Sequence, residues 1–287
     1  MDKSIGFCSM EKFDNRDFNS VGSSRIRARW LLPYWDEAEE YVIGKKYDVL
    51  IFQKVYWSAM MKAFEGIKIL DLCDPDWLEG KPVFEFVDMA DAITTSTEAL
   101  ADYIRRIRPN AFIKCVPDRV NLREALPMKD KHSGPLRNLV WFGYPQNTHY
   151  LYSAFEELIK RGLNLIALSS APLEPPLIYK GKVKIENIPY AHNTINKEII
   201  KGDAVLMPDP VGDERSKYKS NNKTLHAWAL RMPVVKVPED LDKFMDAAVR
   251  EEEATVRHKE IEEKWDVRYS VDDYKAIIEE VKKRKGV

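Results

Sequence analysis

Cysteine is scarce in this chain of 287 residues, and its few cysteines form no pattern. Cys8, Cys73 and Cys115 are far apart, odd in number and without the paired spacing of metal ligands. We therefore expect neither a disulfide framework nor a metal site. Unpaired thiols fit a reducing compartment, so a cytoplasmic protein is expected.

Long apolar runs and an excess of one charge are also missing. No run approaches the roughly 18–20 apolar residues that span a bilayer, and residues 1–6 lack the apolar core of a signal peptide. The sequence thus predicts no membrane span. Lys and Arg number 45 against 46 Asp and Glu, a formal net charge of −1. This balance excludes a broadly basic nucleic-acid coat, though not a local basic groove.

The chain lacks the short motifs that mark common nucleotide and hydrolase sites. It contains no G-x-G-x-x-G dinucleotide fingerprint and no G-x-x-x-x-G-K-[ST] P-loop. Its five histidines show no H-E-x-x-H spacing, and no nucleophile elbow is present. Rossmann dehydrogenase, P-loop, zinc protease and α/β-hydrolase functions are therefore not indicated.

What is present is an alternation of short apolar runs with helical stretches. Strands are predicted at residues 4–8, 47–52, 67–72, 92–96, 111–116, 138–143, 164–169, 183–187, 204–208 and 233–237. Such alternation predicts βαβ units and parallel sheets, hence an α/β fold. The polar segment 123–135, with two prolines and a glycine, is the best boundary between two halves.

The segment 209–223 joins a predicted strand to a predicted helix at the carboxyl end of a sheet, where open α/β folds place ligands. Ser220 or Asn221 can cap that helix, leaving backbone N–H groups free at its start. Cationic donors surround the same point: Lys217, Lys219 and Lys223. A helix start with positive charge is a natural diphosphate site. The alternative is a solvated loop with an ordinary cap.

Two further loops carry candidate residues. Gly143 follows the first strand of the second half, and a glycine there lets a ligand approach the backbone closely. A simple turn glycine, followed by a helix over 148–161, is the alternative. In the first half, carboxylates follow the strand at 67–72 and could bind a polyol or act as a general base, unless they are turn residues. The candidate catalytic residues are Asp74, Asp76 and His149, with Asp71 beside them.

Arginines cluster twice in the first half, as Arg25, Arg27 and Arg29 and as Arg105, Arg106 and Arg108. Ser23 and Ser24 precede the first cluster and predict a helix start there. On that helix the first and last arginines share a face and the middle one points away. Both clusters are expected to be solvated, with a groove for an anionic acceptor as the alternative.

Residues 219–235, Lys-Ser-Asn-Asn-Lys-Thr-Leu-His-Ala-Trp-Ala-Leu-Arg-Met-Pro-Val-Val, resemble the donor-site signature of the group 1, glycogen-synthase-like glycosyltransferases of GT-B fold. Residues 23–27, 90–100 and 116–122 are similar, in the same order, to the early acceptor-side loop, the end of the first domain and the linker entry of that family.

The resemblance implies two Rossmann-like domains whose parallel sheets face each other across a cleft. Residues 1–123, with a C-terminal helix at 262–287 crossing back to them, would form the acceptor-side domain. Residues 136–255 would bind the nucleotide sugar. The implied activity is metal-independent transfer of a hexose to a hydroxyl acceptor, with no cofactor and with a UDP-sugar as the donor.

The resemblance also assigns residues to the two substrates. The donor side is Gly143, Tyr144, Lys217, Ser220, Asn221, Asn222, Lys223 and His226, and the acceptor side is Ser24 and Arg25. The chain departs from the family pattern at three positions: His226 replaces the Glu that binds ribose, Tyr218 stands near the earlier acid of that motif, and Arg231 replaces a glycine.

Two other functions stay open at this point. The short chain and the arginine clusters suggest a phage-type enzyme that glycosylates a hydroxymethylated base in DNA. The missing acidic pair suggests instead an inactive GT-B-like protein that binds nucleotide sugars. The sequence names neither the acceptor nor an oligomeric state.

Overall fold

The computed structural model describes residues 4–10, 21–209 and 212–286. The chain divides into two compact units. Unit 1 comprises Met1–Asn121, Asp213–Asn221 and Asp266–Val287, and unit 2 comprises Leu122–Gly212 and Asn222–Trp265. The nine positions from Asp213 to Asn221 therefore interrupt unit 2 in sequence but belong to unit 1.

Unit 1 is built on a six-stranded sheet of order β2-β1-β3-β4-β5-β6, in which every neighbouring pair is parallel. Its strands are β1 (Ile5–Ser9), β2 (Ala38–Glu40), β3 (Val49–Gln53), β4 (Ile67–Leu72), β5 (Ala92–Thr95) and β6 (Ile113–Cys115). The parallel α/β sheet predicted from the alternation is confirmed. The sequence missed only β2 in this sheet, because Ala-Glu-Glu contains no apolar run.

The helical segments of unit 1 are mostly short. They are α2 (Gly22–Ser24), the π-helix η1 (Arg25–Arg29), the 3₁₀ turns η2 (Leu32–Tyr34), η3 (Asp76–Glu79) and η6 (Glu214–Tyr218), and the helices α3 (Ser58–Ala63), α4 (Val83–Met89), α5 (Glu98–Ile107) and α11 (Arg268–Lys285). The first helix thus begins at Gly22, ahead of the predicted serine cap, and continues as a π-helix.

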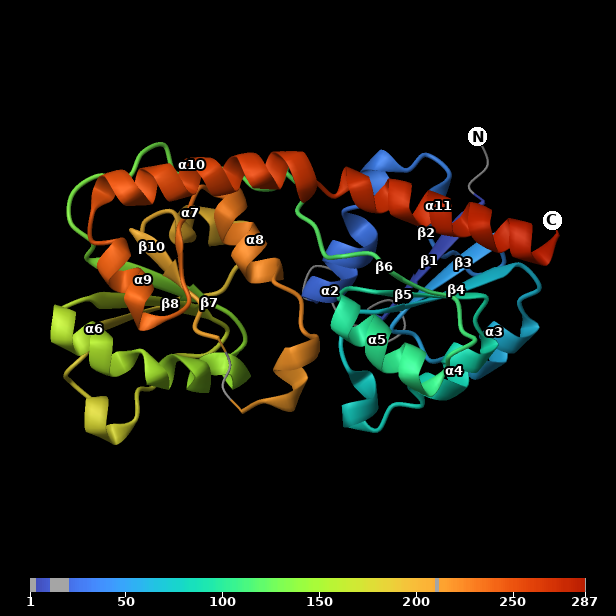
Figure 1. The fold of residues 1–287 in the computed structure, drawn as a ribbon, viewed down its shortest axis with the longest axis horizontal. Coiled ribbons are helices and arrows are strands. Elements are labelled where there is room, and N and C mark those ends of the chain that lie inside the picture. The colour runs from blue at the N-terminus through green and yellow to red at the C-terminus, as the bar shows by residue number, and fades with distance from the viewer. Residues whose placement is uncertain (1–3, 11–20, 210–211, 287) are drawn as a thin grey trace. The chain divides into compact units, whose positions relative to one another are not determined.

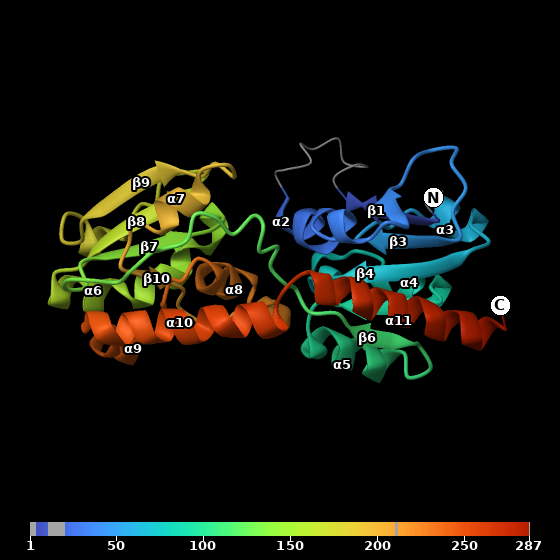
Figure 2. The same ribbon diagram turned by 90° about the horizontal axis from the view of Figure 1, so that it is seen from above.

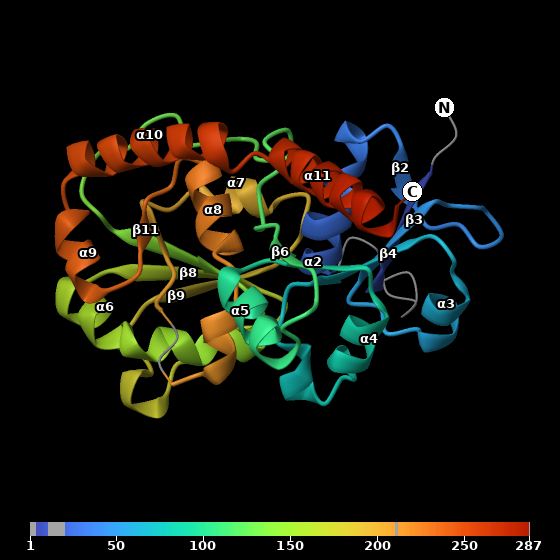
Figure 3. The ribbon, with the colours of Figure 1, turned by 45° about the vertical axis from the view of Figure 1, so that its right-hand side comes forward.

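Helices cover both faces of the unit 1 sheet (Figures 2 and 3). One face packs Phe7, Ile51 and Ile69 against the apolar side of α11, including Ile278. The alternate residues of the same strands face α3, α4 and α5. Because side chains alternate along a strand, both faces are apolar and the strands read as continuous hydrophobic runs.

A buried arginine lies between the sheet and α11. Arg27 is only 3% exposed, so the expectation of a solvated arginine cluster is wrong for this residue. Its Nε donates to Asp71 Oδ2 at 3.1 Å and its Nη1 to Asp118 Oδ1 at 3.2 Å. The Tyr274 hydroxyl of α11 donates to Asp71 Oδ1 at 2.8 Å, and Thr94 donates to the same oxygen at 2.6 Å. A buried charge needs such partners, and these lie far away in sequence.

Unit 2 is built on a five-stranded parallel sheet of order β11-β10-β7-β8-β9. Its strands are β7 (Asn138–Phe142), β8 (Asn164–Ser169), β9 (Ile185–Pro189), β10 (Ala204–Leu206) and β11 (Val234–Val235). Its helical segments are the 3₁₀ helices η4 (Pro145–Ser153) and η5 (Leu177–Tyr179), with α6 (Phe155–Arg161), α7 (Ile195–Ile199), α8 (Asn222–Ala229), α9 (Pro238–Lys243) and α10 (Ala247–Lys264).

In unit 2, α6 lies on one face of the sheet, and α7, α8 and α10 lie on the other (Figure 1). The face toward α6 packs Leu139, Leu165 and Leu206 against Phe155 and Leu158. The continuous helix predicted over 148–161 is corrected by the structure to a 3₁₀ helix followed by α6. Within η4, side chains bond back to carbonyls three residues earlier, which competes with α-helical geometry.

Within the described residues, none of the helices combines the length and the apolar character that crossing a membrane would require.

The Tyr274 hydroxyl should contribute to the stability of the protein, because it donates to the buried Asp71 carboxylate. Tyr274→Phe should lower the free energy of unfolding by about 1–3 kcal/mol, because the buried Asp71 carboxylate loses a donor. Tyr269→Phe, on the same helix but 40% exposed, is the matched control and should change it by less than about 0.5 kcal/mol. Chemical denaturation followed by circular dichroism measures both. Equal effects of the two substitutions would contradict the proposed role of the Tyr274 hydroxyl.

Candidate functional site

The strand order of unit 2 marks one place on its sheet for a ligand. From β7 the chain continues outward through β8 and β9, and then returns to the other side of β7 as β10 and β11. In parallel sheets of this kind, ligands bind outside the carboxyl ends of the strands where the order reverses. In unit 2 this point lies at the ends of β7 and β10, which are followed by Gly143 and by the connection to α8.

Gly143 and Lys223 meet at this edge. A Cβ atom on Gly143 would lie 2.7 Å from Lys223 Nζ and 2.9 Å from Cζ2 of Trp141. Lys223 Nζ lies 5.9 Å from the centroid of the Trp141 ring, within cation–π range. Gly143 is not among the glycines with positive φ, so the backbone conformation does not require it. The missing side chain instead gives the lysine room beside the backbone.

The backbone of Gly143 is held firmly. Its N–H donates to the Leu168 carbonyl at 3.1 Å, and the Ser169 hydroxyl donates to the Gly143 carbonyl at 2.8 Å. Tyr144, the next residue, is 53% exposed. Asn222 and Lys223 open α8, whose first backbone N–H groups have no partner within the helix. The helix start and the lysine together make this edge favourable for an anion.

His226, one turn further along α8, has an ordered neighbourhood. Its Nε2 lies 2.8 Å from Asn196 Oδ1. The Asn196 amide nitrogen donates to the carbonyls of Glu124 and Leu126 at 2.7 and 2.9 Å, which fixes its oxygen toward the histidine. Since Asn196 Oδ1 can only accept, His226 Nε2 carries a proton. The ring also packs edge-on against Phe142, with centroids 5.9 Å apart.

At Arg231, where the pattern of the resembling family has a glycine, this chain has an unusual backbone conformation. Its φ is +58°, in the left-handed region that favours glycine. The side chain is paired with Glu251 at 2.5 Å, and its Nη1 donates to the Asp130 carbonyl at 3.1 Å.

Three residues predicted to bind the donor lie in the other unit. Lys217, Ser220 and Asn221 belong to the segment Asp213–Asn221, which is part of unit 1. The Ser220 hydroxyl donates to Asp118, the same buried carboxylate that pairs with Arg27. Burial raises the pKa of Asp118, and Arg27 and this hydrogen bond from Ser220 oppose the shift.

Tyr218 anchors this segment to unit 1. It is 9% exposed and packs edge-on against Trp77 and Tyr103, with ring centroids 5.4 and 5.6 Å away. The Thr97 hydroxyl donates to the Tyr218 carbonyl at 3.0 Å. Near the position where the resembling family carries the earlier acid, this chain therefore has a buried aromatic anchor. Its partners lie far away in sequence, so sequence reasoning missed this role.

The candidate carboxylates of unit 1 surround one lysine. Lys54 follows β3, and its Nζ lies 2.7 Å from Asp74 Oδ2 and 3.0 Å from Asp76 Oδ1. The Tyr56 hydroxyl donates to Asp76 Oδ2 at 2.7 Å. Burial raises the pKa of Asp76, while Lys54 and Tyr56 act in the opposite direction. Asp71, in contrast, forms an ion pair with the buried Arg27.

The acceptor-side prediction Ser24 connects to this cluster through a buried chain of contacts. Its hydroxyl donates to Gln53 Oε1 at 3.0 Å, and Gln53 Nε2 donates to Cys73 Sγ at 3.9 Å. The Cys73 thiol in turn donates to Asp74 Oδ2 at 3.6 Å. Ser24 is fully buried, so it supports the cluster from within. The Arg25 guanidinium lies 5.7 Å from the centroid of the Trp30 ring.

His149, the third catalytic candidate, lies in unit 2 on η4. It is exposed, and its Nδ1 donates to the Gln146 carbonyl at 2.8 Å, which leaves Nε2 as the basic nitrogen. Across the described parts of the chain, no three or more His, Cys, Asp or Glu residues are grouped so that they could hold a metal ion.

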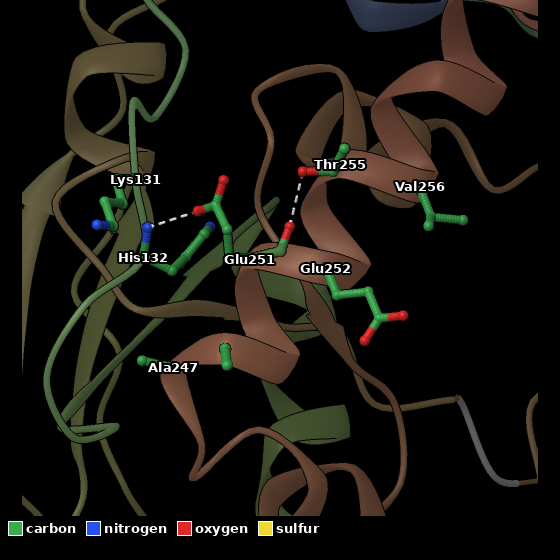
Figure 4. A pocket seen from close by; sticks show the side chains of 8 residues that line it. Lys131, His132, Ala247, Glu251, Glu252, Thr255 and Val256 are labelled. Carbon is green, nitrogen blue, oxygen red and sulfur yellow. Dashed lines mark hydrogen bonds between the residues drawn. The ribbon is translucent and has the colours of Figure 1, made fainter.

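A cavity of about 590 Å³ lies elsewhere in unit 2, beside α10 (Figure 4). Its lining residues are Lys131, His132, Ala247, Ala248, Glu251, Glu252, Thr255 and Val256. The His132 backbone N–H donates to Glu251 Oε2 at 2.8 Å, and the Thr255 hydroxyl donates to the Glu251 carbonyl at 2.8 Å. The cavity contains none of the predicted site residues, and it lies away from the carboxyl edge of the sheet.

The comparisons with known proteins identify the fold. No family model matches the chain, and no curated protein matches its sequence. Among solved structures, the chain is similar to an S. aureus TarM mutant in complex with fondaparinux, alpha-GlcNAc-glycerol and UDP. The TM-score is 0.63 at 11% identity, over 87% of this chain and 57% of the TarM chain.

Two further structures have the same fold. Anabaena HepE, in complex with UDP and glucose, gives a TM-score of 0.61 at 9% identity, over 97% of this chain and 100% of the HepE chain. The pneumococcal O-GlcNAc transferase GtfA, in complex with UDP and GlcNAc, gives 0.53 at 11% identity, over 81% of this chain and 56% of its own. This chain thus spans little more than half the length of TarM and GtfA. Its fold is that of the GT-B glycosyltransferases.

Because His132 is buried, we expect the folded protein to lose stability in acid. Its side chain is 3% exposed, and burial lowers its pKa from the usual 6.5. The unfolded state therefore binds the proton more readily, so stability is lost as the pH falls below 6.5, by at most ~1.4 kcal/mol per pH unit from this group. His132→Gln should flatten this part of the unfolding free energy against pH. Identical slopes for the variant and the wild type would contradict the assignment.

Proposed function

We propose that this protein is a glycosyltransferase that moves a sugar from a nucleotide diphosphate to a hydroxyl acceptor. The observation that carries the proposal is the meeting of Gly143 and Lys223 at the switch point of the unit 2 sheet. A backbone without a side chain, a helix start and a lysine together suit a diphosphate. The complexes of TarM, HepE and GtfA with UDP support a UDP-sugar as the donor.

The proposed donor contacts lie in unit 2. The diphosphate would approach Gly143 and Tyr144 on one side and the N–H groups of Asn222 and Lys223 on the other. As the bond between the sugar and the diphosphate breaks, negative charge grows on the leaving phosphate oxygen. The helix start and Lys223 would stabilise that charge, which is how a transferase of this kind can work without a metal. His226 is the proposed neighbour of the ribose.

Unit 1, which includes helix α11, is the proposed acceptor-side domain, and unit 2 is the proposed donor domain. Asp74 is the better placed of the two unit 1 carboxylates to meet an acceptor, because its side chain is 29% exposed and that of Asp76 only 3%. Ser24 and Arg25 would support this side. His149 remains a proposed base on the donor unit. We also propose a cytoplasmic location from the unpaired thiols.

Nothing in the arginine clusters favours DNA as the acceptor. Arg27 is buried, Arg105 pairs with Glu98 and Asp102, and Arg108 pairs with Asp88. No specific observation in the described residues favours an inactive binding protein either.

The donor site can be tested by nucleotide binding. Lys223→Ala should raise the dissociation constant for UDP about tenfold or more, because a charge-assisted contact to phosphate is lost. Gly143→Ala should also weaken binding, since its Cβ would displace the lysine. Lys160→Ala, an exposed lysine of the same unit, is the matched control and should leave the affinity unchanged. Isothermal titration calorimetry measures all three, and circular dichroism checks that each folds.

Two outcomes would overturn the proposal. One is a wild-type protein that binds none of UDP, GDP and ADP at millimolar concentration. The other is equal nucleotide affinity for the wild type, Lys223→Ala and Gly143→Ala.

A further inference from the structure

Lys54 has an unusual backbone. Among the described residues other than glycine, only Lys54 and Arg231 have a positive φ, and that of Lys54 is +53°. This left-handed conformation is unfavourable for a residue with a side chain, and it persists only where the surroundings enforce it. The Lys54 N–H donates to the Asp71 carbonyl at 3.0 Å, which ties this turn to the neighbouring strand β4.

The turn lies at the switch point of the unit 1 sheet. β2 lies on one side of β1 and β3 on the other, so the strand order reverses between β1 and β3. Lys54 directly follows the carboxyl end of β3. A strained residue at the place where a parallel sheet binds ligands indicates a functional constraint on its side chain.

The Lys54 ammonium group contacts two carboxylates that differ in solvent exposure. The Lys54 side chain is 12% exposed, that of Asp76 3% and that of Asp74 29%. Asp76, fixed by the Tyr56 hydroxyl, holds the ammonium from the inside. Asp74 is the carboxylate that a molecule from solution can reach. The lysine therefore stands between a buried acid and an accessible one.

Two carboxylates so close together cannot both ionise easily without a positive charge between them. Burial alone would lower the pKa of Lys54, but the negative charges of Asp74 and Asp76 outweigh it, so the pKa of Lys54 is raised and the lysine stays charged. The charged ammonium group therefore holds both carboxylates within ion-pair distance, with Asp74 as the more exposed of the two.

We propose that Lys54 is a positioning residue that holds Asp74 in the orientation in which its carboxylate accepts the proton of the attacking hydroxyl. This inference rests on the proposed glycosyl transfer. In the step, the hydroxyl oxygen forms a bond to the anomeric carbon. The bond from that carbon to the diphosphate oxygen breaks, and its electron pair leaves with the nucleotide. The hydroxyl proton goes to the Asp74 carboxylate, so atoms and charge balance.

The test separates this role from a purely structural ion pair. UDP release from UDP-glucose and from UDP-GlcNAc is followed across pH, with water or an added alcohol as the acceptor. Lys54→Met should lower kcat by about 100-fold, a typical contribution of acid–base catalysis. It should also shift the acidic limb of the pH–rate profile to higher pH, because the carboxylates lose their counter-charge. The dissociation constant for UDP should stay within about twofold of the wild-type value, since a tenfold change already requires a lost contact of appreciable strength.

Three further variants serve as controls for Lys54→Met. Lys54→Gly suits the left-handed backbone and so should fold while lacking the ammonium group, with the same kinetic loss as Lys54→Met. Lys54→Arg should restore much of the activity and the wild-type profile. Arg231→Met removes the other ion pair built on a left-handed residue, and it should leave kcat and the profile unchanged.

The outcomes separate the two proposals. A wild-type protein that neither binds UDP nor releases it overturns the proposed function, and this inference with it. If the wild type turns over and Lys54→Met and Lys54→Gly keep its kcat, the inference alone is overturned. A fall in kcat with an unmoved pH profile also overturns it, because that is the effect of a purely structural ion pair.

Discussion

The buried charge of Arg27 is the constraint on which unit 1 depends. Its guanidinium joins a π-helix near the start of the chain to β4, to the segment after β6 and to α11 near the end. A lone buried guanidinium would be prohibitively unstable, so Asp71, Asp118 and the Tyr274 hydroxyl must be in place when it is buried. Through Asp118, the same network also holds Ser220 and thus the segment that leads into α8.

The lysine-rich segment 213–223 is divided between the two units. Its first part belongs to unit 1, anchored by Tyr218 and Ser220, and its last residues open α8 in unit 2. The proposed anion-binding features therefore depend on Gly143, Lys223 and the start of α8, all within unit 2. The Ser220 hydroxyl already donates a hydrogen bond to Asp118. The residue type alone does not reveal this partner.

Much of the fold could be predicted from the sequence, because strands buried on both faces are continuous apolar runs. Ten of the eleven strands in the described chain fall at or beside predicted positions, and β2 lacks the apolar signal. For the site, strand-to-helix loops pointed to Gly143, Lys223 and Asp74 before any contact was known. What sequence could not provide were pairings between distant residues, such as Arg27 with Tyr274, 247 positions apart. The left-handed turn at Lys54 also carries no local signal, since turns of this kind usually contain glycine.

A crystal structure of the protein with UDP tests the proposed donor site most directly. The diphosphate should lie at the carboxyl ends of β7 and β10, against the Gly143 backbone and the first N–H groups of α8, with Lys223 Nζ within hydrogen-bond distance of a phosphate oxygen. UDP bound elsewhere, such as in the cavity beside α10, or with its phosphates away from Gly143 and Lys223, would contradict it.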